Sequence, residues 1–152
     1  MSNQKQENIM KLALIEARKA YEVNEVPVGA IITIGNEIIS TGYNQSISSN
    51  DSTCHAEIVS IRKASNKIGN YRLIDTTLYT TLEPCAMCYG AIVHARISRI
   101  VFGAYDQKSG VCGSAIKLHE KNIFNHKPKV IGGVLEKECS LLLKDFFKER
   151  RN

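Results

Sequence analysis

Two cysteines three residues apart, Cys85 and Cys88, carry the strongest chemical signal in the sequence. Pro84 precedes them, and proline is favoured as the first residue of a helix because its missing N–H needs no partner there. The two thiols are then expected on one face of the first helical turn, where the partial positive charge of the helix N-terminus favours thiolates. Two thiolates on one face make half of a tetrahedral zinc site.

The best candidate for a third ligand is His55, which stands two residues before a glutamate. A second Cys-x-x-Cys, which a four-ligand structural site would want, is absent from the sequence. Three protein ligands with water in the fourth position describe a catalytic zinc, which lowers the pKa of that water from 15.7 toward roughly 7. Two alternatives remain open. One is a thioredoxin-like redox pair; the other is a non-enzymatic zinc module for nucleic acid, closed by Cys54, Cys112 or Cys139.

Glu57 follows the proposed histidine ligand closely enough to stay near the metal without binding it. In the zinc-dependent nucleobase deaminases, whose signature the spacing of these motifs resembles, activated water attacks C6 of adenine or C4 of cytosine, and this attack needs a proton shuttle. We expect Glu57 to take a proton from the water, protonate the ring nitrogen and give a proton to the departing ammonia. The plainer alternative is a first-turn glutamate that complements the helix dipole.

Cys54 is adjacent to His55, and the sequence alone has to decide between them. Successive residues of a helix point ~100° apart, so we expect only one of the two side chains to face the metal. We assign His55 as the ligand. Cys54 is interpreted as a small buried thiol, as are the isolated Cys112 and Cys139.

The composition is that of one globular domain spanning residues 1–152. The chain has a mass of 16.9 kDa, with 43% hydrophobic and 23% charged residues, which is typical of a chain with a real core. No apolar run approaches the ~18–20 residues of a membrane span, and the polar N-terminus does not resemble a secretion signal. Five cysteines, an odd number, favour reduced thiols over disulfides. We therefore expect a cytoplasmic protein without membrane contact.

The net charge of +5 is unevenly distributed. Residues 1–76 contain eight basic and eight acidic side chains, whereas residues 77–152 contain twelve basic and seven acidic ones. Basic clusters of this kind are commonly solvated surface. The more specific interpretation is a polyanionic partner. The clusters are Lys117, Lys121, Lys127 and Lys129, and at the end Lys148, Arg150 and Arg151.

Periodicity and turn signals predict strands that alternate with helices after an initial hairpin at Gly35-Asn36. Helices are expected at 8–21, from an N-cap at Thr53 to about 67, at 85–95 and at 135–150. The apolar stretch 26–32 is expected to lead into a first strand. Further strands are expected at 37–43, 77–81, 99–104 and 129–134, with polar or irregular connections at 44–52 and 105–128. This order predicts an α/β fold, a three-layer α/β/α sandwich around a mixed five-stranded sheet. The helix at 85–95 is apolar all round, so it needs cover from this chain or from a partner subunit.

The order His-x-Glu, then Pro-Cys-x-x-Cys, resembles the signature of the zinc-dependent nucleobase deaminases. Further stretches extend this similarity over nearly the whole chain, in the same order and at similar separations. They are Glu25-Val26-Pro27-Val28-Gly29-Ala30, Gly42-Tyr43-Asn44, His55-Ala56-Glu57, Glu83-Pro84-Cys85-Ala86-Met87-Cys88, Phe102-Gly103-Ala104-Tyr105-Asp106, Gly113-Ser114 and the closing Asp145-Phe146-Phe147-Lys148-Glu149-Arg150-Arg151. Taken together, they resemble the bacterial tRNA-specific adenosine deaminases.

This resemblance implies the cytidine deaminase-like fold, a homodimer with one Zn2+ per subunit, and conversion of the wobble adenosine 34 of a tRNA anticodon stem-loop to inosine. By matched position, Asn44 would bind the flipped base and Asp106 the ribose or backbone beside it. Asn125 would be another contact to the anticodon loop. Val28 and Phe147 are the remaining substrate-binding positions that the resemblance implies.

A rival within the same signature is a deaminase of a free nucleobase or nucleotide, of the guanine or cytosine type. Such an enzyme needs neither a basic second half nor the ending Phe-Phe-Lys-Glu-Arg-Arg, so these features favour tRNA. Cys54 is a departure from the resemblance, which would place a small residue without a thiol at this position.

Overall fold

A mixed sheet of five strands forms the middle layer of the protein in a computed structural model, which describes residues 2–151. The strand order across the sheet is β2-β1-β3-β4-β5. β1 pairs antiparallel with both β2 and β3, whereas β3, β4 and β5 run parallel. The strands are β1 (Gly29–Ile34), β2 (Glu37–Tyr43), β3 (Thr76–Leu82), β4 (Arg99–Ala104) and β5 (Lys129–Ile131).

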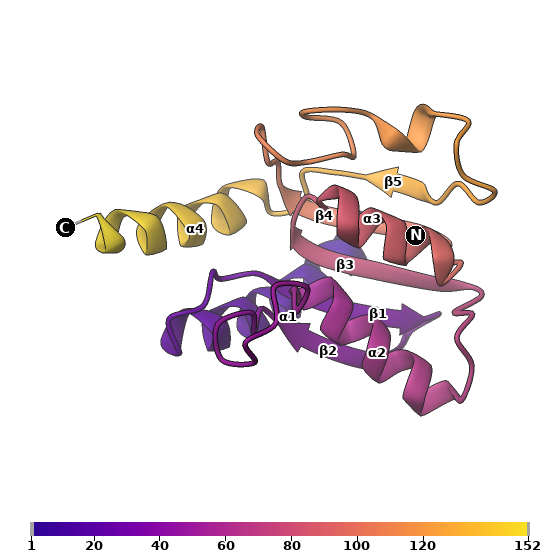
Figure 1. Cartoon of the computed structure of the whole chain (residues 1–152), viewed down its shortest axis with the longest axis horizontal. Coiled ribbons are helices and arrows are strands. Elements are labelled where there is room, and N and C mark those ends of the chain that lie inside the picture. The colour runs from indigo at the N-terminus through magenta and orange to yellow at the C-terminus, as the bar shows by residue number, and fades with distance from the viewer. Residues whose placement is uncertain (1, 152) are drawn as a thin grey trace.

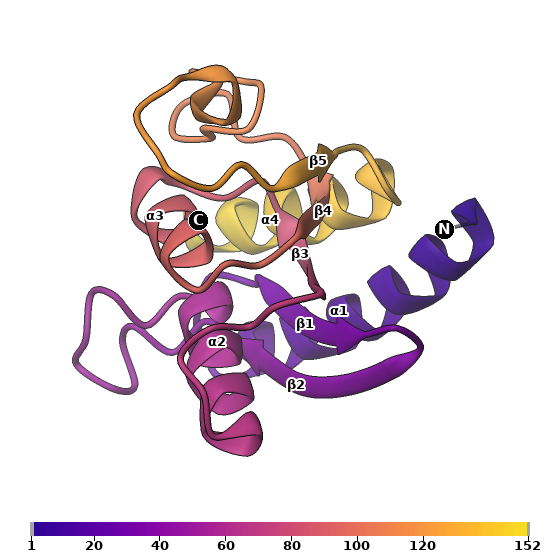
Figure 2. The same cartoon turned by 90° about the vertical axis from the view of Figure 1, so that its right-hand side faces the viewer.

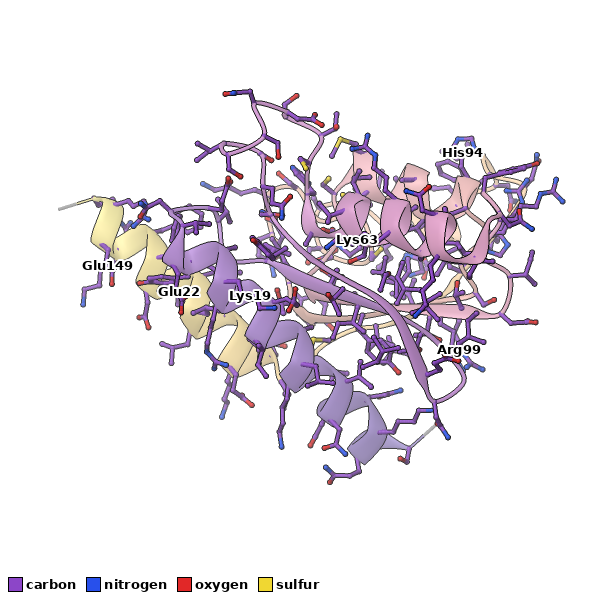
Figure 3. All side chains as sticks on the ribbon, turned by 90° about the horizontal axis from the view of Figure 1, so that it is seen from below. Lys19, Glu22, Lys63, His94, Arg99 and Glu149 are labelled. Carbon is purple, nitrogen blue, oxygen red and sulfur yellow. The ribbon has the colours of Figure 1, made fainter. Side chains whose placement is uncertain are left out.

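Helices cover both faces of this sheet (Figures 1 and 2). α2 and α3 lie on one face, and α1 and α4 lie side by side on the other, as the view in Figure 3 also shows. The helices are α1 (Asn3–Glu22), α2 (Ala56–Ile68), α3 (Ala86–His94) and α4 (Glu136–Arg150), with a single 3-10 turn, η1 (Leu118–Glu120). Among residues 2–151 no helix has the length and hydrophobicity that a membrane crossing requires.

The two larger hydrophobic clusters lie on opposite sides of the sheet because successive strand residues point to opposite faces. Ile32 and Leu78 pack beneath α2 and α3 with Tyr89 and other residues of α3. Their neighbours Ile31 and Tyr79 pack on the opposite side against α1 and α4. The fold thus has one core on each side of the sheet, as the predicted three-layer α/β/α sandwich requires.

β2 contains one extra residue relative to its partner. The pairing steps from Ile32–Ser40 to Thr33–Ile38, which leaves Ile39 without an opposite residue. This bulge places Ile39 and Ser40 on the same face: Ile39 joins the cluster under α2 and α3, and the Ser40 hydroxyl donates to the carbonyl of Ser60 in α2 (2.8 Å). The strand's outer edge is therefore kinked.

The predicted element order and fold class are confirmed, and several element boundaries are corrected; β1, for example, continues to Ile34, beyond the apolar stretch 26–32. α1 begins at Asn3 rather than residue 8, because the Ser2 hydroxyl caps it by accepting from the backbone N–H of Lys5 (3.2 Å). β5 ends at Ile131 rather than 134, just before Gly132 and Gly133. α2 and α3 also begin later than predicted, at Ala56 and Ala86. Residues 1 and 152, the ends of the predicted single domain, lie outside the described residues.

Candidate active site

His55 lies immediately before α2, as its N-cap, and not inside the helix as the predicted cap at Thr53 implied. The side chain that caps this helix belongs to Asn44, at the end of β2: its Oδ1 accepts from the backbone N–H of Ala56 (2.7 Å). A carboxamide oxygen in this position satisfies one of the free N–H groups of the first turn. Asn44 therefore fixes where α2 starts, and the His55 ring is left free to face the neighbouring helix.

The start of α3 presents the two thiols. Cys85 is the N-cap of α3 and Cys88 lies in its first turn. The helix therefore begins at Ala86, one residue later than predicted, and Pro84 lies before the N-cap. The His55 Nδ1 atom is 3.7 Å from Cys85 Sγ and 3.5 Å from Cys88 Sγ. The three donor atoms lie within 4.8 Å of one another. Two helix starts, from segments 30 residues apart, thus converge on one point.

These separations fit a zinc ion. Zn–S bonds of about 2.3 Å and Zn–N bonds of about 2.0–2.1 Å at a tetrahedral angle put S and N about 3.6 Å apart. The two observed sulfur–nitrogen separations lie on either side of that value. The hydrogen bond from Cys88, with that from His55, lowers the pKa of Cys85 to about 4, which favours the thiolate that zinc binds. The donor set therefore fits zinc.

Cys54 does not join this cluster among the described residues. It is buried, with its sulfur 3.8 Å from the Ser49 hydroxyl. The reason given from helical geometry was wrong, because both Cys54 and His55 precede α2. Cys112 and Cys139 are buried in the two cores, as predicted.

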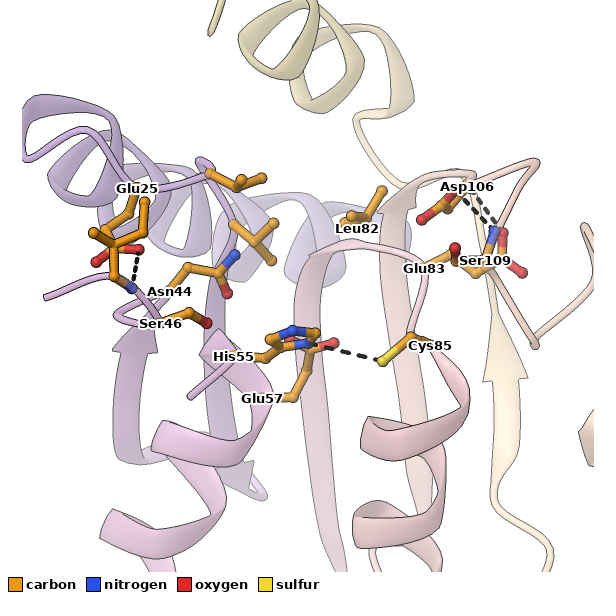
Figure 4. Close-up of a pocket in the computed structure, with 13 residues that line it drawn as sticks. Glu25, Asn44, Ser46, His55, Glu57, Leu82, Glu83, Cys85, Asp106 and Ser109 are labelled. Atoms are coloured by element: carbon orange, nitrogen blue, oxygen red, sulfur yellow. Dashed lines mark hydrogen bonds between the residues drawn. The ribbon is translucent and has the colours of Figure 1, made fainter. Parts of the chain in front are cut away.

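Glu57 lies in the first turn of α2 and is almost completely buried, with 4% of its surface exposed. Burial raises the pKa of this carboxyl group to about 7. A carboxyl group with this pKa can both accept and donate a proton near neutral pH. Figure 4 shows it directly below the His55 ring, which is turned toward Cys85.

A cavity of about 330 Å³ opens beside this cluster. His55, Glu57 and Cys85 form its base, while Asn44 and Asp106 lie on opposite walls (Figure 4). The complete lining is Glu25, Val26, Val28, Asn44, Ser46, Ile47, His55, Glu57, Leu82, Glu83, Cys85, Asp106 and Ser109. Val28, Asn44 and Asp106 are thus brought to the same place as the His-Cys-Cys cluster.

Two other predicted contacts lie elsewhere. Phe147 on α4 is 46% exposed and lines a neighbouring groove of about 640 Å³. This groove shares Val26, Leu82, Asp106 and Ser109 with the cavity. Asn125 is exposed in the connection before β5 and is not part of the cavity lining.

Two buried glutamates at the cavity rim had no role in the sequence interpretation. Glu25 is 1% exposed and its carboxylate accepts from the backbone N–H groups of Ile47 and Ser48 (3.1 and 2.7 Å). Glu83 is 2% exposed and accepts from the loop that carries Asp106. In the sequence each of these glutamates stands beside an apolar strand, in Glu-Val-Pro-Val and in Leu-Glu-Pro. A charged residue in such a place needs buried hydrogen-bond partners, and this was the available signal for both residues.

The basic end of the chain is partly occupied by contacts within the molecule. Arg150 stacks over the Phe146 ring, 3.7 Å from its centroid, and donates to the Asn24 side chain (2.6 Å). Lys148 and Arg151 are exposed. Within residues 2–151, the structure gives neither of them an ion pair.

Comparison with known proteins places this geometry in a family. Residues 3–104 match the cytidine and deoxycytidylate deaminase zinc-binding region. A tRNA-specific adenosine deaminase of Haemophilus influenzae is 48% identical over 95% of this chain and 84% of its own length. A solved structure of a tRNA:A34 deaminase, from work on A-to-I editing at the wobble position, superposes with a TM-score of 0.86 at 42% identity, covering 88% of this chain and 97% of that one.

A guanine deaminase of Bacillus subtilis is also similar, but over less of the chain. It is 40% identical with a TM-score of 0.62, covering 65% of this chain and 64% of the guanine deaminase. The similarity to the tRNA-specific enzymes, in contrast, covers 95% of this chain for the Haemophilus influenzae protein and 88% for the solved tRNA:A34 deaminase structure. The protein therefore belongs to the zinc-binding deaminases and, within them, to the family of tRNA-specific adenosine deaminases.

Proposed function

We propose that this chain, as a single domain, converts the wobble adenosine of a tRNA anticodon to inosine by hydrolysis, with release of ammonia. One observation carries the proposal: the cavity in which the His-Cys-Cys cluster and a buried carboxyl group meet two polar side chains on opposite walls. That cavity belongs to a chain of the tRNA-specific adenosine deaminase family. A tRNA substrate also agrees with the cytoplasmic location that we expect for this protein.

His55, Cys85 and Cys88 would hold one zinc ion per chain. Bound there, zinc supplies a water molecule of lowered pKa beside the substrate. Glu57 would move the protons: its carboxylate accepts one from water and passes it to the adenine ring nitrogen, then takes the remaining proton of the hydroxyl added to the ring carbon and delivers it to the amino group, which leaves as ammonia. Burial suits this role, since it brings the pKa of Glu57 to about 7.

The walls of the cavity would hold the target base and its sugar. The Asn44 oxygen is occupied by the backbone N–H of Ala56, so the amide nitrogen of Asn44 is the group left to donate to an acceptor on the base edge. Val28 offers an apolar contact to the base, and Asp106 an acceptor for a ribose hydroxyl. Phe147, which lines the adjoining groove, would stack on a flanking base, and Asn125 would contact RNA outside the cavity.

A base inside a helical stack cannot reach the bottom of this cavity, so it has to be splayed out. An anticodon loop offers bases that are already unstacked, together with 2′-hydroxyls that distinguish RNA from DNA. The basic excess of residues 77–152 would face the flanking phosphates. These points favour a loop of tRNA over a free nucleobase.

We also propose that the chain forms a homodimer through the outer face of α3. The inner face of this helix is buried with Tyr89, Ile92 and Val93. On the outer face Met87 is 37% exposed and His94 is exposed. A second copy would supply the cover that the all-apolar sequence of this helix requires.

The test of function is inosine at position 34 of a short anticodon stem-loop, compared with free adenosine, cytosine and guanine. We expect rapid conversion of the RNA stem-loop and poor conversion of its deoxy equivalent. Efficient turnover of free nucleobases with an untouched stem-loop would instead establish the guanine- or cytosine-type deaminase.

A further inference from the structure

Glu83 is a buried carboxylate that the proposed mechanism does not use. It is 2% exposed, and within residues 2–151 it forms no ion pair with a lysine or arginine. Its two oxygens instead accept four hydrogen bonds from a single loop. The donors are the backbone N–H groups of Asp106 (3.0 Å), Cys112 (2.9 Å) and Ser114 (3.1 Å), and the Ser114 hydroxyl.

This loop forms the cavity wall opposite Asn44. Asp106 and Ser109 line the cavity, and the Asp106 Oδ1 atom in turn accepts from the N–H groups of Lys108 and Ser109 (both 3.1 Å). Glu83 therefore holds the backbone of Asp106, and Asp106 holds the turn that follows it. Because Glu83 stands two residues before Cys85, the same short segment carries a metal-ligand candidate and the anchor of the substrate wall (Figure 4).

The loop is shaped to fit the carboxylate. A Cβ atom added at Gly110 would lie 2.5 Å from both carboxylate oxygens of Glu83 and closer still to the carboxyl carbon. No side chain larger than hydrogen fits there without displacing the carboxylate. A second strap runs beside it, since the N–H of Val111 donates to the carbonyl of Pro84 (3.0 Å).

From this geometry we infer that Glu83 is a positioning residue for substrate binding. It sets the distance between the Asp106 wall and the catalytic centre, without touching the reacting atoms. The inference rests on the proposed deamination of tRNA. Its physical basis is the match of donors to acceptors: an ionised carboxylate is acceptor-only and accepts all four bonds, whereas a glutamine amide would turn an NH2 group toward N–H donors.

Glu83→Gln is the direct test. We expect the amides of Asp106, Cys112 and Ser114 to exchange with solvent at least about tenfold faster, because their charged acceptor is removed. Zinc content should stay at the wild-type level. KM for the stem-loop should rise on the order of 10- to 100-fold, as displacement of a binding wall by about 1 Å allows, while kcat changes less than about threefold.

Glu16→Gln is the matched control. Glu16 is also a buried carboxylate, 7% exposed, but it pairs with Lys19 on α1 and takes no part in the cavity. We expect this variant to keep the wild-type KM and the wild-type exchange of the three loop amides.

Gly110→Ala is the second variant, and it keeps the test valid if Glu83→Gln fails to fold. It removes no polar group and only displaces the Glu83 carboxylate, so it should reproduce the rise in KM. Unchanged KM in both folded variants, or loss of zinc and kcat at constant KM, would overturn the inference. A wild-type chain that forms no inosine would count against the proposed function instead, and the amide exchange would still report on the anchor.

Discussion

Cys88 and Cys139 are both buried thiols, but only Cys88 lies beside His55 and Cys85. We expect Cys88→Ala to lose most of the roughly one zinc per chain of the wild type, because two protein ligands remain where three are needed. Cys139→Ala removes a thiol packed against Gly103 and should keep the metal. Elemental analysis of the purified proteins measures the zinc content per chain. Full zinc retention in Cys88→Ala would refute the ligand assignment.

Glu57 gives the second prediction at this scale. Glu57→Ala should keep the fold and the zinc, because this carboxyl group is not part of the metal-ligand cluster. Deamination should fall by several orders of magnitude, since the variant lacks both the general base and the later acid, steps typically worth about 10²–10⁴-fold each. Inosine formation is measured at matched metal content, with Glu16→Ala as the control. Near wild-type turnover would exclude Glu57 as the shuttle.

At the scale of elements, the loop between β2 and α2 depends on Glu25. Burial alone would raise the pKa of Glu25, but the hydrogen bonds from Ser48 and Ile47 outweigh it and lower the pKa from its ordinary value of 4.5. Because the pKa of Glu25 is lower in the folded state, its carboxylate stabilises the fold fully above pH 4.5. This stabilisation is lost as the pH falls through the pKa that Glu25 has in the folded protein. The loop should therefore loosen in acid.

Glu25→Gln tests this. We expect it to lower the free energy of unfolding by about 1–3 kcal/mol at neutral pH, the typical cost of leaving buried donors unsatisfied. The difference from wild type should shrink as the pH falls below 4.5 and the wild-type carboxylate also becomes protonated. Urea unfolding at several pH values measures it, and Glu22→Gln, at an exposed position of α1, is the control. A difference that stays constant with pH would contradict the assignment.

The same loop shows why element starts were harder to predict than elements. Strand and helix interiors follow local periodicity, and β2 and β4 were predicted residue for residue. The cap of α2 comes from Asn44, twelve residues before Ala56, through a contact that exists only in the folded chain. No local pattern at Thr53 carries that information. For the same reason Glu57 could be proposed from its spacing, whereas Glu25 and Glu83 needed their distant loop partners to be seen.

At the scale of the whole molecule, the basic C-terminus divides into two roles. Arg150 stacks on Phe146 of its own helix and ties α4 to the segment after α1 through Asn24, so Arg150→Ala should lower Tm. Lys148→Ala with Arg151→Ala should leave Tm unchanged and weaken RNA binding. In that double variant, the log–log dependence of affinity on salt should become shallower by about 0.7 for each phosphate that is no longer neutralised. Binding titrations at several salt concentrations measure this, and an unchanged slope would place the phosphates elsewhere.

The assembly is tested at the outer face of α3. Met87→Glu puts a charge into the proposed homodimer interface, where burying it is costly. This variant should therefore have the mass of one chain in solution, whereas the wild type should have the mass of two chains. Ile15→Glu, at a 48% exposed position on α1, should not change the mass. Light scattering coupled to size-exclusion chromatography gives the answer. A wild-type mass of one chain would remove the dimer from the proposal.

The kink in β2 bears on how two copies can meet. β2 is the last strand on its side of the sheet, and an outermost strand offers unpaired N–H and C=O groups that can recruit a strand from another molecule. The extra residue at Ile39 interrupts the regular spacing of those groups in the middle of β2. Addition of a foreign strand along this edge would meet a mismatch there. The bulge thus acts against uncontrolled strand-to-strand aggregation, and it leaves ordered pairing to a helical surface such as the outer face of α3.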